Sequence, residues 1–300
     1  MSQSICAYLA PEGLEKTVEL ELNDVVEKHE RLFIAKGKPQ KSYFSQNIWL
    51  NPMLLKIESI GDAVRQLKAI QRNWALYPFA VHRRAQLIQN QLPYIPTKPL
   101  KFLQKVPESH LGSWTLLDEN TILASPHCTS FVPNGEWNFL EDHENPPSRA
   151  YLKLWEFFTR IQRYPDKNDV CLDLGASPGG WTWVLRQLGC KVIAYDRSPL
   201  DTSMQKDRKI DFYQGDCFKV KPETHPEATW IFSDVVAYPG KVLPFVRDYV
   251  KACPDKNFVF TLKFQGTNHY QVIENFMDIP GSHIIHLTHN KHELTWYRLK

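Results

Sequence analysis

The hydrophobic pattern of the second half of the chain predicts short buried strands that alternate with helices. The apolar run Val170–Leu174 is short enough for a buried parallel strand. A glycine-rich turn follows it, then a helix predicted over Trp181–Leu188 and a second strand over Lys191–Tyr195. Further strands are predicted from the apolar runs at Ile210–Tyr213, Trp230–Phe232 and Phe258–Phe264. This order of elements predicts an α/β sheet.

The first half of the chain has a less regular pattern and predicts a smaller domain of mixed α and β structure. The predicted elements are strands at Ile5–Leu9, Leu32–Ala35 and Asn47–Leu50, helices over Gly13–Glu30, Ile60–Trp74 and Phe79–Gln91, and a hairpin of Thr115–Leu117 and Thr121–Ala124. This order is compatible with a small ferredoxin-like unit.

Length and a proline-rich junction divide the chain into two predicted domains. Three hundred residues with 43% hydrophobic content are enough to form two cores. Asn145-Pro146-Pro147 reads as an extended linker that ends one domain and precedes a helix. We therefore expect an N-terminal α+β domain over residues 1–145 and a larger α/β domain over residues 146–300.

The distribution of charge indicates a nucleic-acid partner. Residues 31–105 hold 13 basic and 2 acidic side chains, whereas residues 106–145 hold 7 acidic side chains and no Lys or Arg. The basic stretch also contains Tyr43, Phe44 and Trp49, among other aromatic residues. Cations for phosphates and aromatic rings for stacking are typical of an RNA-binding surface. A solvated basic face without a ligand is the alternative.

Neither a membrane nor a metal is expected as a partner. No apolar run approaches the roughly 18 residues that cross a bilayer, and no secretory leader is visible. The six cysteines are scattered without a CxxC pair, which disfavours a zinc site or a disulfide framework. The expected location is the cytoplasm.

The glycine-rich turn is typical of a nucleoside-cofactor site. Gly175, Gly179 and Gly180 let the backbone turn tightly and approach a ligand. The turn lacks the GxGxxG fingerprint of a pyrophosphate site, and Asp173 precedes it. An acid there favours the ammonium of an amino-acid tail, which S-adenosylmethionine (SAM) carries. Asp196, 23 residues after Asp173, is placed to bind a ribose diol.

Further cofactor contacts are expected near the turn and after the third strand. Asp216 is placed to accept a hydrogen bond from the adenine amino group. Ser177 offers its hydroxyl or only its backbone N–H, and Ser148 either contacts the methionine carboxylate or caps a helix. The expected cofactor-binding set is Ser148, Asp173, Gly175, Ser177, Pro178, Gly179, Gly180, Asp196, Asp216 and Asp234.

Five segments resemble one known family in order and spacing. The motif LDLGASPGGW is similar to the SAM motif of the FtsJ-type ribose 2′-O-methyltransferases, and SRAYLK, FSDVVAYP, FTLKF and KHELTWYRLK match its other motifs. The likeness is specific over residues 146–300, and within the family it is greatest to bacterial enzymes that methylate a cytidine ribose in 23S rRNA. It implies a catalytic tetrad of Lys153, Asp234, Lys263 and Glu293.

The resemblance also implies a fold and a partner. The expected fold is the Rossmann-like class I SAM-dependent methyltransferase, a doubly wound seven-stranded sheet whose seventh strand, near residues 294–299, is antiparallel. The N-terminal domain is expected to bind RNA, as a ferredoxin-like or THUMP-related module. This domain is shorter than the complete RNA-binding module of those relatives. The resemblance therefore specifies the RNA target less well than it specifies the chemistry.

The tetrad suits methyl transfer to a ribose hydroxyl, which needs a base beside it. A lysine serves as that base only when its pKa falls toward neutrality, through burial or a neighbouring cation. We expect Lys153 and Lys263 to lower each other's pKa by charge repulsion. Asp234 and Glu293 are expected to orient the two amines. Lys263, at the carboxyl end of a strand, is the expected proton acceptor.

The predicted function is SAM-dependent 2′-O-methylation of large-subunit rRNA, with two alternatives. The same chemistry could act on tRNA or an mRNA cap, or the chain could be a SAM-binding RNA or ribosome assembly protein without turnover. Base-amino methylation is disfavoured, because its proline-proline loop follows the fourth strand. In this chain Asn145-Pro146-Pro147 lies before the glycine turn and is followed by Ser148.

Overall fold

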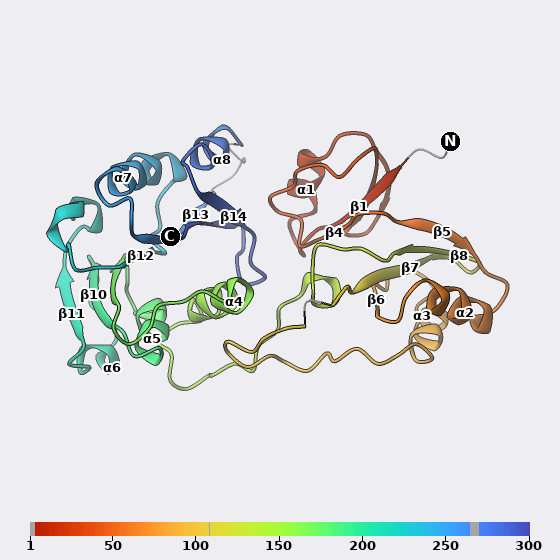
Figure 1. Ribbon diagram of the computed structural model, residues 1–300, viewed down its shortest axis with the longest axis horizontal. Helices are drawn as coiled ribbons and strands as arrows, with labels where there is room; N and C mark the ends of the chain where they lie inside the picture. The colour runs from red at the N-terminus through yellow and green to blue at the C-terminus, as the bar shows by residue number, and fades with distance from the viewer. Residues whose placement is uncertain (1–3, 108, 265–269) are drawn as a thin grey trace. The chain divides into compact units, whose positions relative to one another are not determined.

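A computed structural model describes residues 4–107, 109–264 and 270–300 (Figure 1). The chain separates into two compact units. The first comprises residues 1–100 and 104–138, and the second comprises residues 101–103 and 139–300. Each unit has its own sheet structure and core, and each is described by itself below.

The second unit is built on a seven-stranded sheet with the strand order β11-β10-β9-β12-β13-β15-β14. Strands β9 to β13 run parallel, and β15 is antiparallel to both of its neighbours. The bounds are β9 Val170–Leu174, β10 Lys191–Asp196, β11 Ile210–Gln214, β12 Trp230–Ser233, β13 Asn257–Lys263, β14 Ser282–Ile285 and β15 Glu293–Arg298. The predicted doubly wound sheet with an antiparallel seventh strand is confirmed.

Helices cover both faces of this sheet (Figure 1). On one face, α4 places Phe158 and α5 places Trp181 against Phe232 of β12. On the other face, α7 places Phe245 near Phe260 of β13. The bounds are α4 Tyr151–Ile161, α5 Gly180–Gln187, α6 Thr202–Gln205, α7 Pro239–Ala252 and α8 Tyr270–Met277. The strand order reverses between β9 and β12, and ligands of open α/β sheets bind at that point.

The first unit contains two four-stranded sheets, with the orders β2-β3-β1-β4 and β5-β8-β7-β6. Its strands are β1 Ile5–Leu9, β2 Val25–His29, β3 Leu32–Lys36, β4 Asn47–Trp49, β5 Met53–Lys56, β6 Trp74–Leu76, β7 Gly112–Asp118 and β8 Thr121–Ser125. Its helices are α1 Glu15–Glu21, α2 Ile60–Ile70 and α3 His82–Gln89. Trp74 and Trp114 lie in the core of the second sheet, fully buried against residues of α2 and α3.

The structure corrects two helix predictions in the first unit. The helix predicted over Gly13–Glu30 ends at Glu21, and Val25–His29 forms β2 instead, because it hydrogen-bonds to β3. The helix predicted over Ile60–Trp74 ends at Ile70, and Trp74 begins β6, which pairs with β7. In both cases pairing with another strand overrides the local helical pattern. A ferredoxin-like unit has a second helix before its fourth strand, and none lies between β3 and β4, where every residue is described.

Candidate functional site

Two lysines and two carboxylates meet at the carboxyl ends of the central strands. Lys153 Nζ lies 3.0 Å from Asp234 Oδ1 and 2.6 Å from Glu293 Oε2. Lys263 Nζ lies 3.1 Å from the same Asp234 Oδ1 and 4.0 Å from Glu293 Oε1. The structure therefore brings all four residues of the expected tetrad into one cluster.

Four different elements supply this cluster. Lys153 is the third residue of α4, and Asp234 directly follows β12. Lys263 is the last residue of β13, and Glu293 is the first residue of β15. These two residues are register partners in the antiparallel pair. Directly opposite positions place their side chains on the same face of the sheet, which holds this lysine beside this glutamate.

The cluster is shielded from water but electrically balanced. The side chains are between 10% and 17% exposed, and two ammonium groups face two carboxylates. Burial alone would lower the pKa of Lys153, but the charges and hydrogen bonds of Asp234 and Glu293 outweigh it, so the pKa lies above its ordinary value. The expectation that Lys263 would lower the pKa of Lys153 is wrong. The attraction of the two adjacent carboxylates raises this pKa, and repulsion between the two lysines does not offset that attraction. Lys153 is a charged residue in this geometry.

A second buried carboxylate holds the loop that leads to Glu293. Glu156 lies one turn beyond Lys153 on α4 and is fully buried. It accepts hydrogen bonds from Arg160 Nη1 at 3.0 Å, from the backbone N–H of Thr288 at 3.0 Å and from that of His289 at 3.4 Å. Residues 286–292 are thereby tied to the helix that carries Lys153. No sequence signal beyond its spacing from Lys153 pointed to Glu156.

A pocket of about 320 Å³ extends from Asp234 along the carboxyl ends of β9, β10 and β11. Five expected cofactor residues line it: Gly175, Ser177, Asp196, Asp216 and Asp234. Its other lining residues were not expected from the sequence: they are Arg197, Ser198, Gly215, Cys217, Phe218, Val235, Val236 and Lys241. Most of these lie within two residues of an expected residue in the chain, and that proximity was the signal that could have found them.

Hydrogen bonds already orient the acids of this pocket. Asp196 accepts from the backbone N–H groups of Ser177 at 3.0 Å and Ser198 at 2.9 Å. Asp216 accepts from Arg197 at 2.6 Å and from the N–H of Phe218 at 3.1 Å. The hydrogen bond from Arg197 is the main cause that lowers the pKa of Asp216. The Ser177 hydroxyl donates to Pro199 O at 2.8 Å, so this side chain closes the turn.

Asp173, another expected residue, does not line the pocket. Asp173 is fully buried; its Oδ2 accepts from Thr182 at 2.6 Å, and its Oδ1 has no partner among the described residues. Burial raises the pKa of Asp173 to about 7. A buried acceptor without a donor fits the ammonium of an amino-acid tail.

The glycine turn packs tightly against the start of α4. Pro178, Gly179 and Gly180 do not line the pocket. A Cβ on Gly180 would lie 2.5 Å from Ser148 Oγ and 3.3 Å from the Tyr151 backbone nitrogen. The helix-cap alternative for Ser148 is wrong, since α4 begins at Tyr151 with Ala150 as its N-cap. The Ser148 hydroxyl is buried without a partner in the described part of the chain.

No group of three His, Cys, Asp or Glu residues in 4–107, 109–264 and 270–300 is arranged to hold a metal ion. Within the same ranges, none of the helices has the length and apolar character needed to cross a membrane.

Comparisons with known proteins identify related sequences. Residues 146–277 match the family model described as FtsJ-like methyltransferase. The chain is similar to the ribosomal RNA large subunit methyltransferase M of Halorhodospira halophila, with 31% identity over 188 residues that cover 58% of this chain and 54% of that protein. The protein of the same name from Alkalilimnicola ehrlichii is 36% identical over 135 residues, which cover 42% and 36%.

One solved structure adds a distant likeness. An RNA methyltransferase from Salinibacter ruber in complex with S-adenosyl-L-homocysteine is 17% identical, with a TM-score of 0.32 and coverage of 51% of this chain and 92% of that one. The chain spans about half the length, or less, of the curated relatives named above. The segment that matches the FtsJ-like methyltransferase family model lies in the second unit, where the sequence predicted the resemblance.

Proposed function

We propose that this protein is an RNA ribose 2′-O-methyltransferase that acts on large-subunit rRNA, on a cytidine. One observation carries the proposal: Asp234 belongs both to the lysine–carboxylate cluster and to the wall of the 320 Å³ pocket. A cofactor in that pocket would reach the amines that can activate a hydroxyl. The family match within the second unit and the rRNA methyltransferase activity named for the relatives support both the class and the RNA substrate.

Two residues of the pocket wall, together with the buried Asp173, fit SAM in three places. Asp196 would hold the ribose diol, and Asp216 would accept from the adenine amino group while Phe218 covers the ring. The unpartnered Asp173 Oδ1 would face the ammonium of the amino-acid tail. When bound, SAM supplies an electrophilic methyl group.

The chain's own residues would position and deprotonate the ribose hydroxyl. Lys263, in its neutral form, would accept the proton of the 2′-hydroxyl, while SAM would supply the methyl group and leave as S-adenosylhomocysteine with the electron pair of its broken sulfur–carbon bond. Lys153 keeps its charge, because Asp234 and Glu293 raise its pKa, and so it fixes the orientation of both carboxylates. Holding hydroxyl and methyl in line would provide much of the rate enhancement.

The test is transfer of labelled methyl from SAM to total RNA from cells that lack the protein, followed by nucleoside mass spectrometry. The expected product is 2′-O-methylcytidine in large-subunit rRNA. Label in tRNA or at an mRNA cap would contradict large-subunit rRNA as the substrate. Label on a base would contradict methylation of the ribose hydroxyl. SAM binding without any transfer would favour a binding protein.

A further inference from the structure

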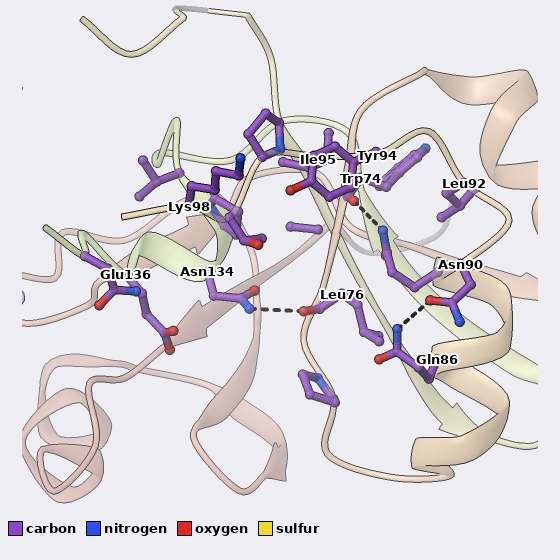
Figure 2. A pocket seen from close by; sticks show the side chains of 18 of the residues that line it. Trp74, Leu76, Gln86, Asn90, Leu92, Tyr94, Ile95, Lys98, Asn134 and Glu136 are labelled. Carbon is purple, nitrogen blue, oxygen red and sulfur yellow. Dashed lines mark hydrogen bonds between the residues drawn. The ribbon is translucent and has the colours of Figure 1, made fainter. Parts of the chain in front are cut away.

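The first unit contains a pocket that the proposed function does not use. A pocket of about 600 Å³ opens beside the edge strand β6, and residues of α3, the 92–100 segment and the 132–138 segment line it. Figure 2 shows Gln86 and Asn90 of α3 on one side and Asn134 and Glu136 on the opposite side. This volume is within the range of small-ligand sites.

The pocket wall is rich in amides and nearly free of net charge. Gln86, Gln89, Asn90, Asn134 and Asn138 all contribute to it, with one cation, Lys98, and one anion, Glu136. An amide offers a donor and an acceptor side by side, which matches the hydrogen-bonding edge of a nucleobase. Asn134 Oδ1 is a buried acceptor without a partner among the described residues.

Apolar and aromatic groups supply a stacking surface at the same place. Tyr94 is 74% exposed, although it belongs to a pocket wall together with Ile95 and Pro96. An exposed aromatic ring costs hydration and gains nothing from packing in the free protein. Unpaired RNA bases stack on such rings.

β6 lies at the edge of its sheet, but its outward-facing carbonyls already accept hydrogen bonds from side chains, so a peptide strand cannot add there. Gln89 Nε2 donates to Trp74 O at 3.2 Å, and Asn134 Nδ2 donates to Leu76 O at 3.0 Å. These carbonyls are the acceptors that a docking strand would need. The pocket therefore favours a compact ring over an extended polypeptide.

The nearest helix also offers a phosphate contact. Arg83, Gln86 and Asn90 are all exposed on α3, at spacings of three and four residues, which place them on one helix face. A cation one turn from the amides is positioned for the phosphate that joins consecutive nucleotides.

We propose that this pocket binds an unpaired nucleobase of the RNA substrate, with Tyr94 stacking on the ring and Gln86 and Asn90 reading its edge. The inference rests on the proposed function, since it assigns part of the RNA to the first unit. It gives that unit a base-reading role in addition to general electrostatic attraction.

The test measures binding of short single-stranded oligoribonucleotides to the full chain across a series of salt concentrations. The variants are Tyr94→Ala and the double variant Gln86→Ala/Asn90→Ala. The matched controls are Tyr94→Phe, which keeps the ring, and Gln91→Ala, which removes an exposed amide outside the pocket. A second probe carries abasic ribose at every position.

The pocket variants should bind the base-bearing probe about tenfold more weakly than the wild type and the controls. The dependence of affinity on salt should not change, because no cation is removed. Affinity for the abasic probe should be equal in all variants, which also shows that the fold is intact. Equal affinity for the base-bearing probe, or equal losses with both probes, would overturn the inference. Methyl transfer by the wild type is measured separately, so that a failure of the proposed function is seen in that assay alone.

Discussion

Lys263 and Glu293 are direct register partners across β13 and β15, yet Glu293 is held more tightly by Lys153. The Lys263 Nζ to Glu293 Oε1 distance is 4.0 Å, whereas Lys153 Nζ lies 2.6 Å from Glu293 Oε2. Lys263 keeps a single close carboxylate contact, with Asp234. The two lysines are therefore not equivalent, and Lys263 is the amine less committed to an ion pair.

The first prediction separates charge from basicity at Lys263. Lys263→Arg keeps a cation beside Asp234, but a guanidinium does not deprotonate at ordinary pH. We expect kcat for methyl transfer to fall by at least about 100-fold, with SAM affinity changed little. Single-turnover kinetics and calorimetric SAM titration measure the two quantities.

The control for this variant is Lys251→Arg, an exposed lysine near the end of α7. It should behave as the wild type. Methyl transfer by Lys263→Arg at a rate close to that of the wild type would exclude Lys263 as the proton acceptor.

The second prediction concerns the pH dependence of stability through Asp173. Its pKa is raised by burial to about 7, so the folded state binds a proton that the unfolded state releases near pH 4. The free energy of unfolding without SAM should therefore fall as pH rises from about 4 to 7. Asp173→Asn removes this dependence and should be more stable than the wild type at pH 8, by up to about 4 kcal/mol. Urea unfolding at several pH values measures the difference.

Ionisation of Asp173 should have opposite effects on two quantities: it should lower the free energy of unfolding and raise the affinity for SAM. If Asp173 faces the ammonium of SAM, wild-type affinity for SAM should increase between pH 6 and 8 as the carboxyl ionises. Asp173→Asn should bind SAM weakly at every pH. A variant that is both more stable and fully able to bind SAM would contradict the assigned contact.

The third prediction tests the buried Glu156. Glu156→Ala removes the acceptor for Arg160 and for the backbone N–H groups of Thr288 and His289. Breaking a buried ion pair from one side should destabilise the protein by about 3 kcal/mol. It should also lower kcat, because the loop before Glu293 loses its anchor. Chemical unfolding and initial rates measure these effects, and the exposed Glu144→Ala serves as the control.

The fourth prediction uses the turn glycine nearest the cluster. Gly175 has a φ of +85°, and a Cβ there would lie 2.8 Å from Val235 Cβ and 3.0 Å from Val235 Cα. Gly175→Ala should displace the segment after Asp234 and weaken SAM binding by at least about tenfold. Gly240→Ala is the matched control, because its Cβ would meet no atom within 4 Å. Equal SAM affinity in the two variants would show that the turn tolerates a side chain.

The sequence by itself determined the α/β fold of the second unit and the chemistry to look for in it. Short apolar runs and a glycine turn are local signals, and Val170–Leu174 forms a strand with the predicted bounds. Tertiary structure alone decided that Val25–His29 is a strand, that Ser148 is not a helix cap, and that Lys153 is the lysine paired with Glu293. It also decided that five amides of the first unit share one pocket. The physical reason is the same in each case. Periodicity reports the environment of neighbouring residues, whereas hydrogen-bond partners and ion-pair distances depend on which segments meet in the folded chain.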